Sequence, residues 1–437
     1  MFNFKQTLVA FAAIAIFATT GCTPTPVTEE PTPTNPSNVV EVKDQNITAN
    51  TTWKADKIYL LKGFNYVRSG ATLTIETGTI IKGDKDTKGT LIVTSGAKIM
   101  AEGTAAKPIV FTSNQAKGSR AAGDWGGLVI LGKAKVNKLS AVVEGENQTL
   151  FGGSDDADNS GVLKYVRIEF PGISIDPDKE INGLTLGGVG NGTTIDYVQV
   201  SHSGDDAFEW FGGSVNAKHL VAYRTLDDDF DTDNGFSGKV QYAVSLRDPA
   251  LADVSSSNGF ESDNDGTGST ATPQTSAQFA NVSIFVAPGA MNSKYANAIQ
   301  IRRNSALSIY NAVIVGAYPN GINLTSADTT QYNAGSARVQ GLSLVGMTNI
   351  TKYVPFGMSF SSTINANDVT MSILNLMLNS SYNMLITPNF LPAAGSPLLT
   401  NGVTLPTGFD TNTHRGAFGT TDWTATWTNF DPQNTNY

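Results

Sequence analysis

The chain has 437 residues, of which 15% are charged and 40% are hydrophobic, and its formal net charge is −9. This much apolar content is enough to bury a core, and the negative charge argues against nucleic acid as the main partner. The chain holds three histidines and one cysteine. These residues are too few for a disulfide framework or a zinc cluster, and we expect no cysteine–histidine catalytic pair.

The first 21 residues have the pattern of a secretory leader. Lys5 precedes an apolar run from Leu8 to Phe17, which is too short to span a membrane, so we expect a cleaved signal peptide. Cys22 stands where a bacterial lipobox places its lipidated cysteine, although Thr19 replaces the usual aliphatic residue. The resemblance implies an acyl anchor, such as palmitate, at Cys22. The alternative is ordinary signal cleavage beside an incidental cysteine.

Residues 22–42 form a Pro/Thr-rich tether with five prolines. Such a segment favours extended polyproline II at roughly 3.1 Å per residue, so it could hold the globular part on the order of 50 Å from the membrane. Glu29 and Glu30 resemble the acidic surface-export signal of Bacteroidota lipoproteins. This resemblance implies a lipid-anchored protein of the outer membrane, exposed at the cell surface.

The chain then repeats itself. Stretch 69–83 matches stretch 87–101, with Leu73 on Leu91 and Ile81 on Ile99. Each stretch alternates apolar and polar residues and then reaches a glycine, which is typical of a short strand closed by a turn. Such strands, at about twenty residues per cycle, predict a chain wound into stacked coils.

The second half carries a clearer repeat. Six segments begin with Asn or Asp and have an apolar third residue, at spacings of 24, 22, 30, 39 and 23 residues: 182–186, 206–210, 228–232, 258–262, 297–301 and 320–324. The third positions predict an inward apolar stack, and the Asn and Asp side chains can hydrogen-bond along a column. The excess residues in the long spacings predict loops on one face of a solenoid.

The Asn and Asp column resembles the asparagine ladder of right-handed parallel β-helices of the pectate-lyase-like type. The resemblance covers most of residues 50–400 and implies an all-β fold with a single right-handed solenoid. The tail with Trp423 and Trp427 also resembles a large family of Bacteroidota surface lipoproteins, which implies a fold and a location but no reaction. We therefore predict a signal peptide at 1–21, a tether at 22–42, the β-helix at 43–400 and an aromatic capping segment at 401–437.

Acidic residues cluster on three successive coils of this predicted solenoid. Glu209, Asp231 and Glu261 would form one outward column with neighbouring carboxylates about 5 Å apart. Their repulsion is roughly 1 kcal/mol in water and about 3 kcal/mol at an effective dielectric of 20, so they favour a cation, a basic partner or raised pKa values. Stretches 229–235 and 261–266 alternate oxygen ligands and end in Gly, as Ca²⁺ loops do. The candidate Ca²⁺ ligands are Glu209, Asp231, Asp233, Glu261, Asp263 and Asp265.

The alternative for these carboxylates is a solvated acidic face that binds no cofactor. Asp206 and Asp228 are expected in the ladder rather than as ligands.

Many β-helix proteins cleave polysaccharides, and a lyase needs an Arg or Lys base beside the carboxylates that hold Ca²⁺ and the uronate. Arg224 and Arg247 are the candidate catalytic bases, with Arg302 and Arg303 as further candidates. The alternative is that they neutralise the acidic columns. Segment 204–206 looks like the Gly-Asp-Asp of polygalacturonase-type hydrolases, but the accompanying Gly-His-Gly and Arg-Ile-Lys motifs are missing.

Trp210 and Tyr223 lie beside the acidic loops and could bind a sugar by stacking, although Trp210 falls on an inward position that favours the core. Since no catalytic motif is complete, we predict a surface-tethered binding, adhesion or structural module for carbohydrate or another envelope component. The alternative is a Ca²⁺-dependent polysaccharide lyase that acts on acidic glycans through coils 205–265.

Overall fold

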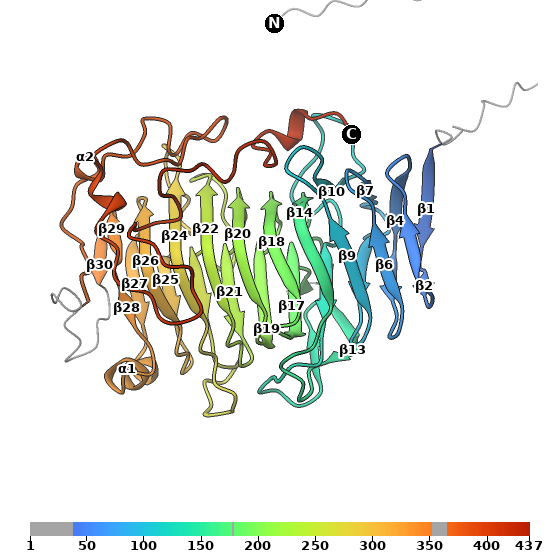
Figure 1. The fold of residues 1–437 in the computed structure, drawn as a ribbon, viewed down its shortest axis with the longest axis horizontal. Helices are drawn as coiled ribbons and strands as arrows, with labels where there is room; N and C mark the ends of the chain where they lie inside the picture. Colours follow the sequence, from blue (N-terminus) through green and yellow to red (C-terminus); the bar gives the residue numbers. More distant parts are fainter. Residues whose placement is uncertain (1–37, 177–178, 352–364) are drawn as a thin grey trace, which may run out of the picture. The chain divides into compact units, whose positions relative to one another are not determined.

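The computed structural model describes residues 38–176, 179–351 and 365–437, which belong to one compact unit, Asn38–Tyr437. The predicted signal peptide, Cys22 and most of the tether lie outside the described residues. Almost every regular element of this unit is a strand, and two long parallel sheets run along it (Figure 1).

The larger sheet has 15 strands among the described residues. They are β1 (Val39–Lys43), β3 (Thr51–Trp53), β4 (Ile58–Lys62), β6 (Thr72–Ile75), β7 (Ile80–Gly83), β9 (Lys98–Glu102), β10 (Ile109–Ser113), β14 (Gly161–Glu169), β18 (Thr194–Ser201), β20 (Asn216–Tyr223), β22 (Lys239–Arg247), β24 (Gln278–Val286), β26 (Ser308–Val315), β28 (Val339–Gln340) and β29 (Ser343–Val345).

The smaller sheet has 11 strands in the same part of the chain. They are β2 (Asn46–Ile47), β5 (Phe64–Val67), β8 (Thr90–Val93), β11 (Leu128–Leu131), β17 (Leu184–Val189), β19 (Phe208–Gly213), β21 (Phe230–Asp233), β23 (Phe260–Ser262), β25 (Asn297–Ile301), β27 (Asn320–Leu324) and β30 (Asn349–Thr351).

Few other elements occur in the described residues. Two hairpins pair β12 (Ala141–Val143) with β13 (Glu146–Phe151) and β15 (Ser174–Asp176) with β16 (Lys179–Glu180). The α-helices are α1 (Ser326–Asn333) and α2 (Ile373–Leu376), and single 3₁₀ turns lie at Pro397–Leu399 and Pro432–Asn434. None of the helices in the described ranges has the length and apolar character needed to cross a bilayer.

The chain alternates between the two sheets, so each coil stacks on the coil before it. In the smaller sheet β17, β19, β21, β23, β25 and β27 pair in parallel and in this order. The predicted inward column pairs residue by residue and is buried: Leu184, Phe208, Phe230, Phe260, Ile299 and Ile322. The register predicted for the second half is therefore confirmed.

The first half is also coiled, but its register differs from the sequence repeat. Leu73 on β6 pairs with Ile99 on β9, and Leu91 on β8 pairs with Leu128 on β11. The repeat alone left the register of the first half open, and the match of Leu73 with Leu91 is not the stacking register, because β6 and β8 belong to different sheets. Both strands alternate inward and outward residues, so an offset between sheets produces the same pattern as a true coil repeat.

The Asn and Asp column forms a continuous ladder. The side-chain oxygen of each member accepts a hydrogen bond from the next coil: Asn182 from the Asp206 amide (3.2 Å), Asp206 from the Asp228 amide (2.8 Å), Asp228 from the Asn258 amide, Asn258 from the Asn297 amide (3.1 Å) and Asn297 from the Asn320 side chain (3.1 Å). The ladder satisfies backbone donors that would otherwise be buried without a partner at the entrance to the smaller sheet.

The long strands of the larger sheet bend at one residue each. Tyr165, Tyr197, His219 and Tyr242 have φ of 51°, 55°, 52° and 60°, in the left-handed region that costs energy for residues other than glycine. Their rings stack on one another with centroids 4.4, 4.2 and 5.1 Å apart. We infer that this outward stack offsets the backbone strain.

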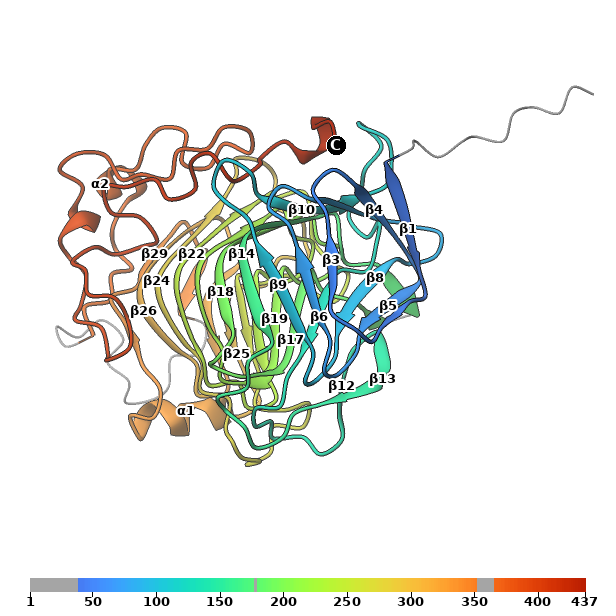
Figure 2. The same ribbon diagram turned by 45° about the vertical axis from the view of Figure 1, so that its right-hand side comes forward.

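The C-terminal segment covers this stack from outside. Trp427 is 1% exposed and packs edge-on against Tyr165 and Tyr197. Farther on, the Tyr437 hydroxyl donates to Glu169 on β14 (2.6 Å). The segment thus runs back along the side of the solenoid toward its early coils instead of covering the last coils alone (Figures 1 and 2).

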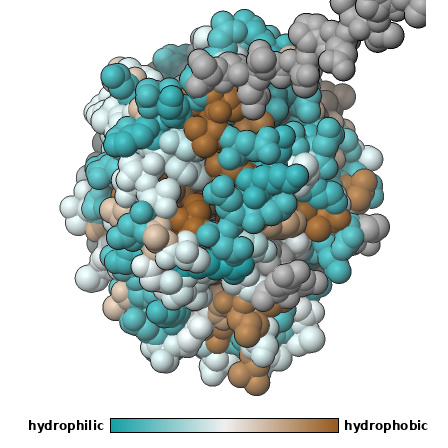
Figure 3. All heavy atoms as spheres, turned by 90° about the vertical axis from the view of Figure 1, so that its right-hand side faces the viewer, coloured by the Kyte–Doolittle hydropathy of each residue, from teal (hydrophilic) through white to brown (hydrophobic). Residues whose placement is uncertain are grey.

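The open end formed by β1 and β2 is protected by charge. Glu41 and Lys43 are exposed on β1, and charged side chains on an edge strand discourage pairing with other chains. This end of the stack is mainly hydrophilic, with separate apolar patches (Figure 3).

The extra residues of the long coils form loops at both edges of the smaller sheet, so the expectation of loops on one face alone is corrected. Loop 248–259 precedes β23, loop 263–277 follows it, and loop 287–296 precedes β25. The outer face of β19, β21 and β23 therefore lies between loops.

The ladder makes a testable contribution to stability. The Asn297 side chain donates to Asn258 (3.0 Å) and Gln300 (2.6 Å) and accepts from Asn320 (3.1 Å). We expect Asn297→Ala to lower the free energy of unfolding in urea by about 1–3 kcal/mol, because it leaves buried partners unsatisfied. The matched control is Asn191→Ala at an exposed turn. Equal effects of the two substitutions would contradict a structural role for the ladder.

Candidate functional site

The predicted acidic column exists on the outer face of the smaller sheet. Glu209 on β19 pairs with Asp231 on β21, which pairs with Glu261 on β23. Gln300 and Asn323 continue the column without charge. Parallel pairing fixes the backbone positions of these three residues one strand spacing apart, so their side chains leave the sheet side by side.

The ladder residues decide which outward carboxylates receive a side-chain donor. Where the ladder residue is Asn, its side-chain amide can donate to the outward column: Asn182 to Glu209, Asn258 to Glu261 (3.2 Å) and Asn297 to Gln300 (2.6 Å). Asp206 and Asp228 replace that amide by a second acid. No donor is therefore available from these coils, and Asp231 Oδ1 is buried without a hydrogen-bond partner.

These residues line a cavity of about 420 Å³, which we call the acidic pocket. Its carboxylates are Glu144, Asp205, Asp206, Glu209, Asp227, Asp228, Asp231 and Glu261, and Ser255 and Ser256 belong to the loop that walls it. Asp206 and Glu209 are each only 7% exposed. Among the described residues nothing donates to Asp206 Oδ2 or Glu209 Oε1, so both oxygens remain free to bind a ligand.

Two groups of carboxylates have the spacing of a cation site. The oxygens of Asp205, Asp206 and Asp227 lie within 4.8 Å of one another, and so do those of Asp206, Glu209 and Asp231. Ca²⁺ binds oxygen at about 2.3–2.6 Å, so ligands on opposite sides of one ion lie about 5 Å apart. Both groups match this span and share Asp206.

Burial, followed by repulsion between neighbouring carboxylates, sets the protonation of the pocket. These two causes raise the pKa of Asp206, Glu209 and Asp231 well above the usual range for carboxyl groups. They also raise the pKa of Asp227 and Glu261 to about 8, although Ser255 and Arg302 respectively oppose the shift. Without a cation, the folded pocket therefore holds protons near neutral pH.

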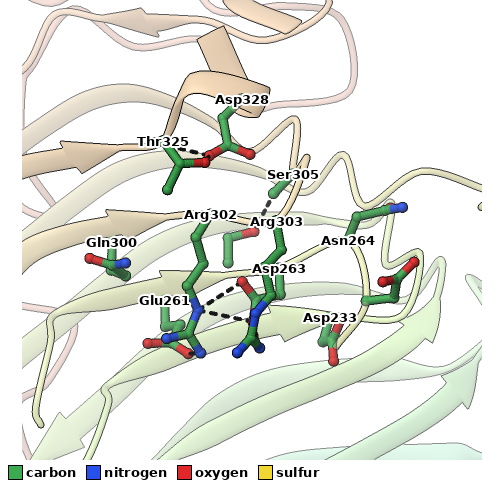
Figure 4. A network of polar contacts seen from close by, with 12 residues as sticks. Asp233, Glu261, Asp263, Asn264, Gln300, Arg302, Arg303, Ser305, Thr325 and Asp328 are labelled. Carbon is green, nitrogen blue, oxygen red and sulfur yellow. Dashed lines mark hydrogen bonds and ion pairs between the residues drawn. The ribbon is translucent and has the colours of Figure 1, made fainter. Parts of the chain in front are cut away.

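Arg302, which follows β25, is the arginine that lines the acidic pocket. Its guanidinium lies between Glu261, which it pairs with at close range, and Asp263 (2.9 Å), as Figure 4 shows. Arg303 also pairs with Asp263 (2.7 Å). Asp263, a predicted Ca²⁺ ligand, is thus neutralised by two arginines and is not among the residues that line the pocket.

The candidate base Arg247 is held in a structural network. Its side chain is 0% exposed, pairs with Asp229 (3.1 Å) and donates to the carbonyl oxygens of Asn258 and Asp227 (both 2.6 Å). Arg224, which follows β20, pairs with Asp248 (2.7 Å). Neither lines the acidic pocket, so the expectation that they act as bases there is corrected in favour of the alternative, in which they neutralise acids.

The two aromatic residues considered for sugar stacking are buried. Trp210 is 0% exposed and stacks on Phe208 and Phe236 within the solenoid. Tyr223 is 1% exposed, and its hydroxyl donates to backbone carbonyls at Leu385 and Phe430 of the C-terminal segment. The proposal that they bind a ligand is corrected, because neither ring has a free face.

A second cavity adjoins the acidic pocket and shares Glu144 with it. This adjoining groove has a volume of about 840 Å³ and combines aromatic with polar residues: Phe64, Tyr66, Phe211, Asn137, Lys138, Lys179, Asp233 and Asp265. Asp233 and Asp265, both predicted Ca²⁺ ligands, thus line the groove and not the acidic pocket. Burial raises the pKa of Asp233 to about 6.

Only three of the six predicted Ca²⁺ ligands line the acidic pocket. Glu209, Asp231 and Glu261 meet in the acidic pocket, whereas the other three members do not. Asp205, Asp206 and Asp227 complete the pocket and were absent from the predicted set. The available signal was the Asp-Asp pair on each of two successive coils, next to ladder positions that are Asn elsewhere.

Comparison with known proteins bears on the family. The model of the pectate-lyase-like beta helix domain matches residues 45–377. A solved structure, that of pectate lyase Pel9A, is 13% identical over 84% of this chain and 89% of that chain, with a TM-score of 0.37, which supports no inference about activity. No curated protein matches the chain. Since the family model spans most of the sequence, the all-β, right-handed parallel β-helix is confirmed, and the chain belongs to the pectate-lyase-like beta helix domain family.

Proposed function

We propose that this chain is a lipid-anchored protein of the outer-membrane surface. Its β-helix would bind a glycan or another envelope component without catalysing a reaction. The anchor rests on the leader and Cys22. Binding is supported above all by one feature, the acidic pocket together with the adjoining groove. Pockets that combine aromatic surface with a few convergent polar groups are the usual form of ligand sites.

We further propose that the acidic pocket binds Ca²⁺. Asp205, Asp206, Glu209, Asp227 and Asp231 are the residues that would hold it, because their oxygens have the required spacing. The cation would neutralise carboxylates that otherwise repel one another, and it would present a positive centre at the end of the groove.

A Ca²⁺-dependent polysaccharide lyase is the second candidate, and Arg302 is the observation that favours it. Arg302 lines the pocket and its side chain is 32% exposed, so an acidic glycan could approach it. However, Glu261 and Asp263 outweigh the effect of burial and raise the pKa of Arg302, which opposes loss of the proton that a base must lose. The non-catalytic module therefore ranks first.

Ca²⁺ binding can be separated from the ladder role by one isosteric change. Asp206→Asn keeps an oxygen for the Asp228 amide but removes the charge shared by both ligand groups. In titration calorimetry on residues 38–437 we expect Ca²⁺ affinity to fall by about tenfold or more, a typical order for loss of a metal-site residue. The apo protein should also melt at a higher temperature. Asp56→Asn, at a side chain that is 75% exposed, is the control. Unchanged affinity would contradict the assigned ligands.

Protonation of the pocket predicts an unusual pH dependence. The folded pKa of Asp227 and Glu261 is about 8, against about 4 in the unfolded chain. Between these values the folded state binds more protons, so stability falls as pH rises from about 4 to about 8. We expect this decline in urea unfolding with a chelator, a shallower decline in Asp227→Asn, and its suppression by Ca²⁺. Stability that rises through this window would overturn the assignment.

Binding of a glycan and its cleavage can be distinguished by experiment. Titration with neutral, acidic and amino polysaccharides, with and without Ca²⁺, should give saturable binding without cleavage. We expect Phe64→Ala in the groove to weaken binding by about fivefold or more, since an aromatic ring contributes on the order of 1 kcal/mol of contact energy. Leu139→Ala, at a 96% exposed side chain, is the control. Unsaturated products that depend on Arg302 would instead establish the lyase.

A further inference from the structure

The hairpin of β12 and β13 connects the two cavities. Its strands pair only with each other among the described strands, and it lies outside the two stacked sheets (Figure 2). Val142, Val143, Glu144 and Gly145, at the end of β12 and in the turn, line the adjoining groove. Glu144 also lines the acidic pocket, and among the described residues it is the one that the two cavities share. A ligand that moves Glu144 in one cavity therefore changes the wall of the other.

The base of this hairpin is anchored, whereas the side chain at its tip is exposed. Ala141, Val143 and Phe151 are buried in an apolar cluster with Val129 and other residues on the outer face of the smaller sheet. Glu144 follows β12 directly and is exposed. Its side chain can therefore turn toward the acidic pocket without disturbing the cluster that holds the hairpin in place.

The Ca²⁺ site proposed above needs at least one more ligand. Ca²⁺ takes 6–8 oxygen ligands. The two groups of carboxylates with the spacing of a cation site contain Asp205, Asp206, Glu209, Asp227 and Asp231, and each residue offers one ligand atom. Five oxygens fall short of the lower limit, so the coordination must be completed from elsewhere in the pocket.

Three further carboxylates line the pocket, and they differ in their freedom to move. Asp228 belongs to the ladder, where it accepts hydrogen bonds from the backbone and side-chain amides of Asn258. Glu261 lies on β23 and pairs with Arg302 at close range. Glu144 is the third, and it stands on the turn of a hairpin outside the sheets. A ligand that must move toward the ion can come from this turn with the least disturbance of the solenoid.

The buried end of the pocket has carboxylate oxygens that lack a hydrogen-bond donor. Asp227 Oδ1 and Asp231 Oδ1 are buried without a partner, and Glu209 is only 7% exposed. Such oxygens are costly to bury unless a ligand binds them. Burial is the main cause of the raised pKa of Glu209, and the charges of Asp231, Asp205 and Glu144 add to it. Glu144 thus lies within electrostatic range of these buried oxygens.

We propose that Glu144 completes the coordination of Ca²⁺, and that the cation thereby fixes the tip of the β12–β13 hairpin as a wall of the adjoining groove. This inference rests on the proposed Ca²⁺ site and adds how that site controls the groove. Without a cation, Glu144 faces carboxylates of like charge, which disfavour its approach. Because coupling between two binding events is reciprocal, a ligand that packs against the fixed tip raises the Ca²⁺ affinity by the same factor.

Hydrogen exchange and titration calorimetry on residues 38–437, which form one compact unit with its own core, test this proposal. We expect Ca²⁺ to slow exchange of the amides from Val143 to Glu146 by about tenfold, within the usual range of coupling between sites. Glu144→Ala should lower the Ca²⁺ affinity by about tenfold, and it should abolish the slowing even at saturating Ca²⁺. The matched control is Asp176→Ala. Asp176 is an exposed acid on the other hairpin that lines the groove but not the pocket, so both responses should remain.

The results separate this inference from the Ca²⁺ site itself. Glu144 is exposed, so Glu144→Ala should melt in chelator at the temperature of the unsubstituted chain or slightly above it. Ca²⁺ binding that is equally tight in Glu144→Ala would overturn this inference and leave the proposed Ca²⁺ site intact. So would Ca²⁺ binding that leaves the hairpin amides unchanged, or slowing that persists in the variant. If the unsubstituted chain binds no Ca²⁺, both proposals are wrong.

Discussion

In-register parallel stacking is the constraint on which the rest of this structure depends. It places each residue of a coil about 4.8 Å from its counterparts in the neighbouring coils. Stacking apolar residues or side-chain amides in this way is favourable, because they pack or hydrogen-bond along the column. The column of Leu184, Phe208 and Phe230 and the Asn ladder are examples. Stacking carboxylates is unfavourable, because it brings like charges together. The acidic pocket lies where the sequence places acids in a repeat that favours neutral residues.

The ladder connects the fold to the candidate site. Asn258 uses its oxygen for the next backbone amide and its amide nitrogen for Glu261. Asp206 can provide only the first of these contacts, so its second oxygen is left without a donor. The Asn-to-Asp change thus preserves the backbone hydrogen bonds of the coil and leaves a carboxylate oxygen at the proposed cation site. Asp206 is therefore both a ladder residue and a proposed ligand.

Much of this arrangement could be predicted from the sequence because it is local and periodic. Spacings between Asn or Asp residues give the register of Glu209, Asp231 and Glu261, since a one-residue slip would expose every inward side chain. Features that depend on distant segments could not be predicted. Tyr223 has an outward position on its strand, and it is buried only because residues 385 and 430 return to cover it. Arg247 is likewise fixed by carbonyl groups of loops whose paths no periodicity encodes.

The C-terminal segment gives the two sheets different outer faces. On the larger sheet, left-handed residues such as Tyr197 and His219 form an aromatic stack that the segment covers with Trp427 and Trp423. On the smaller sheet, the outer face at β19, β21 and β23 is not covered by the C-terminal segment and instead lines the acidic pocket.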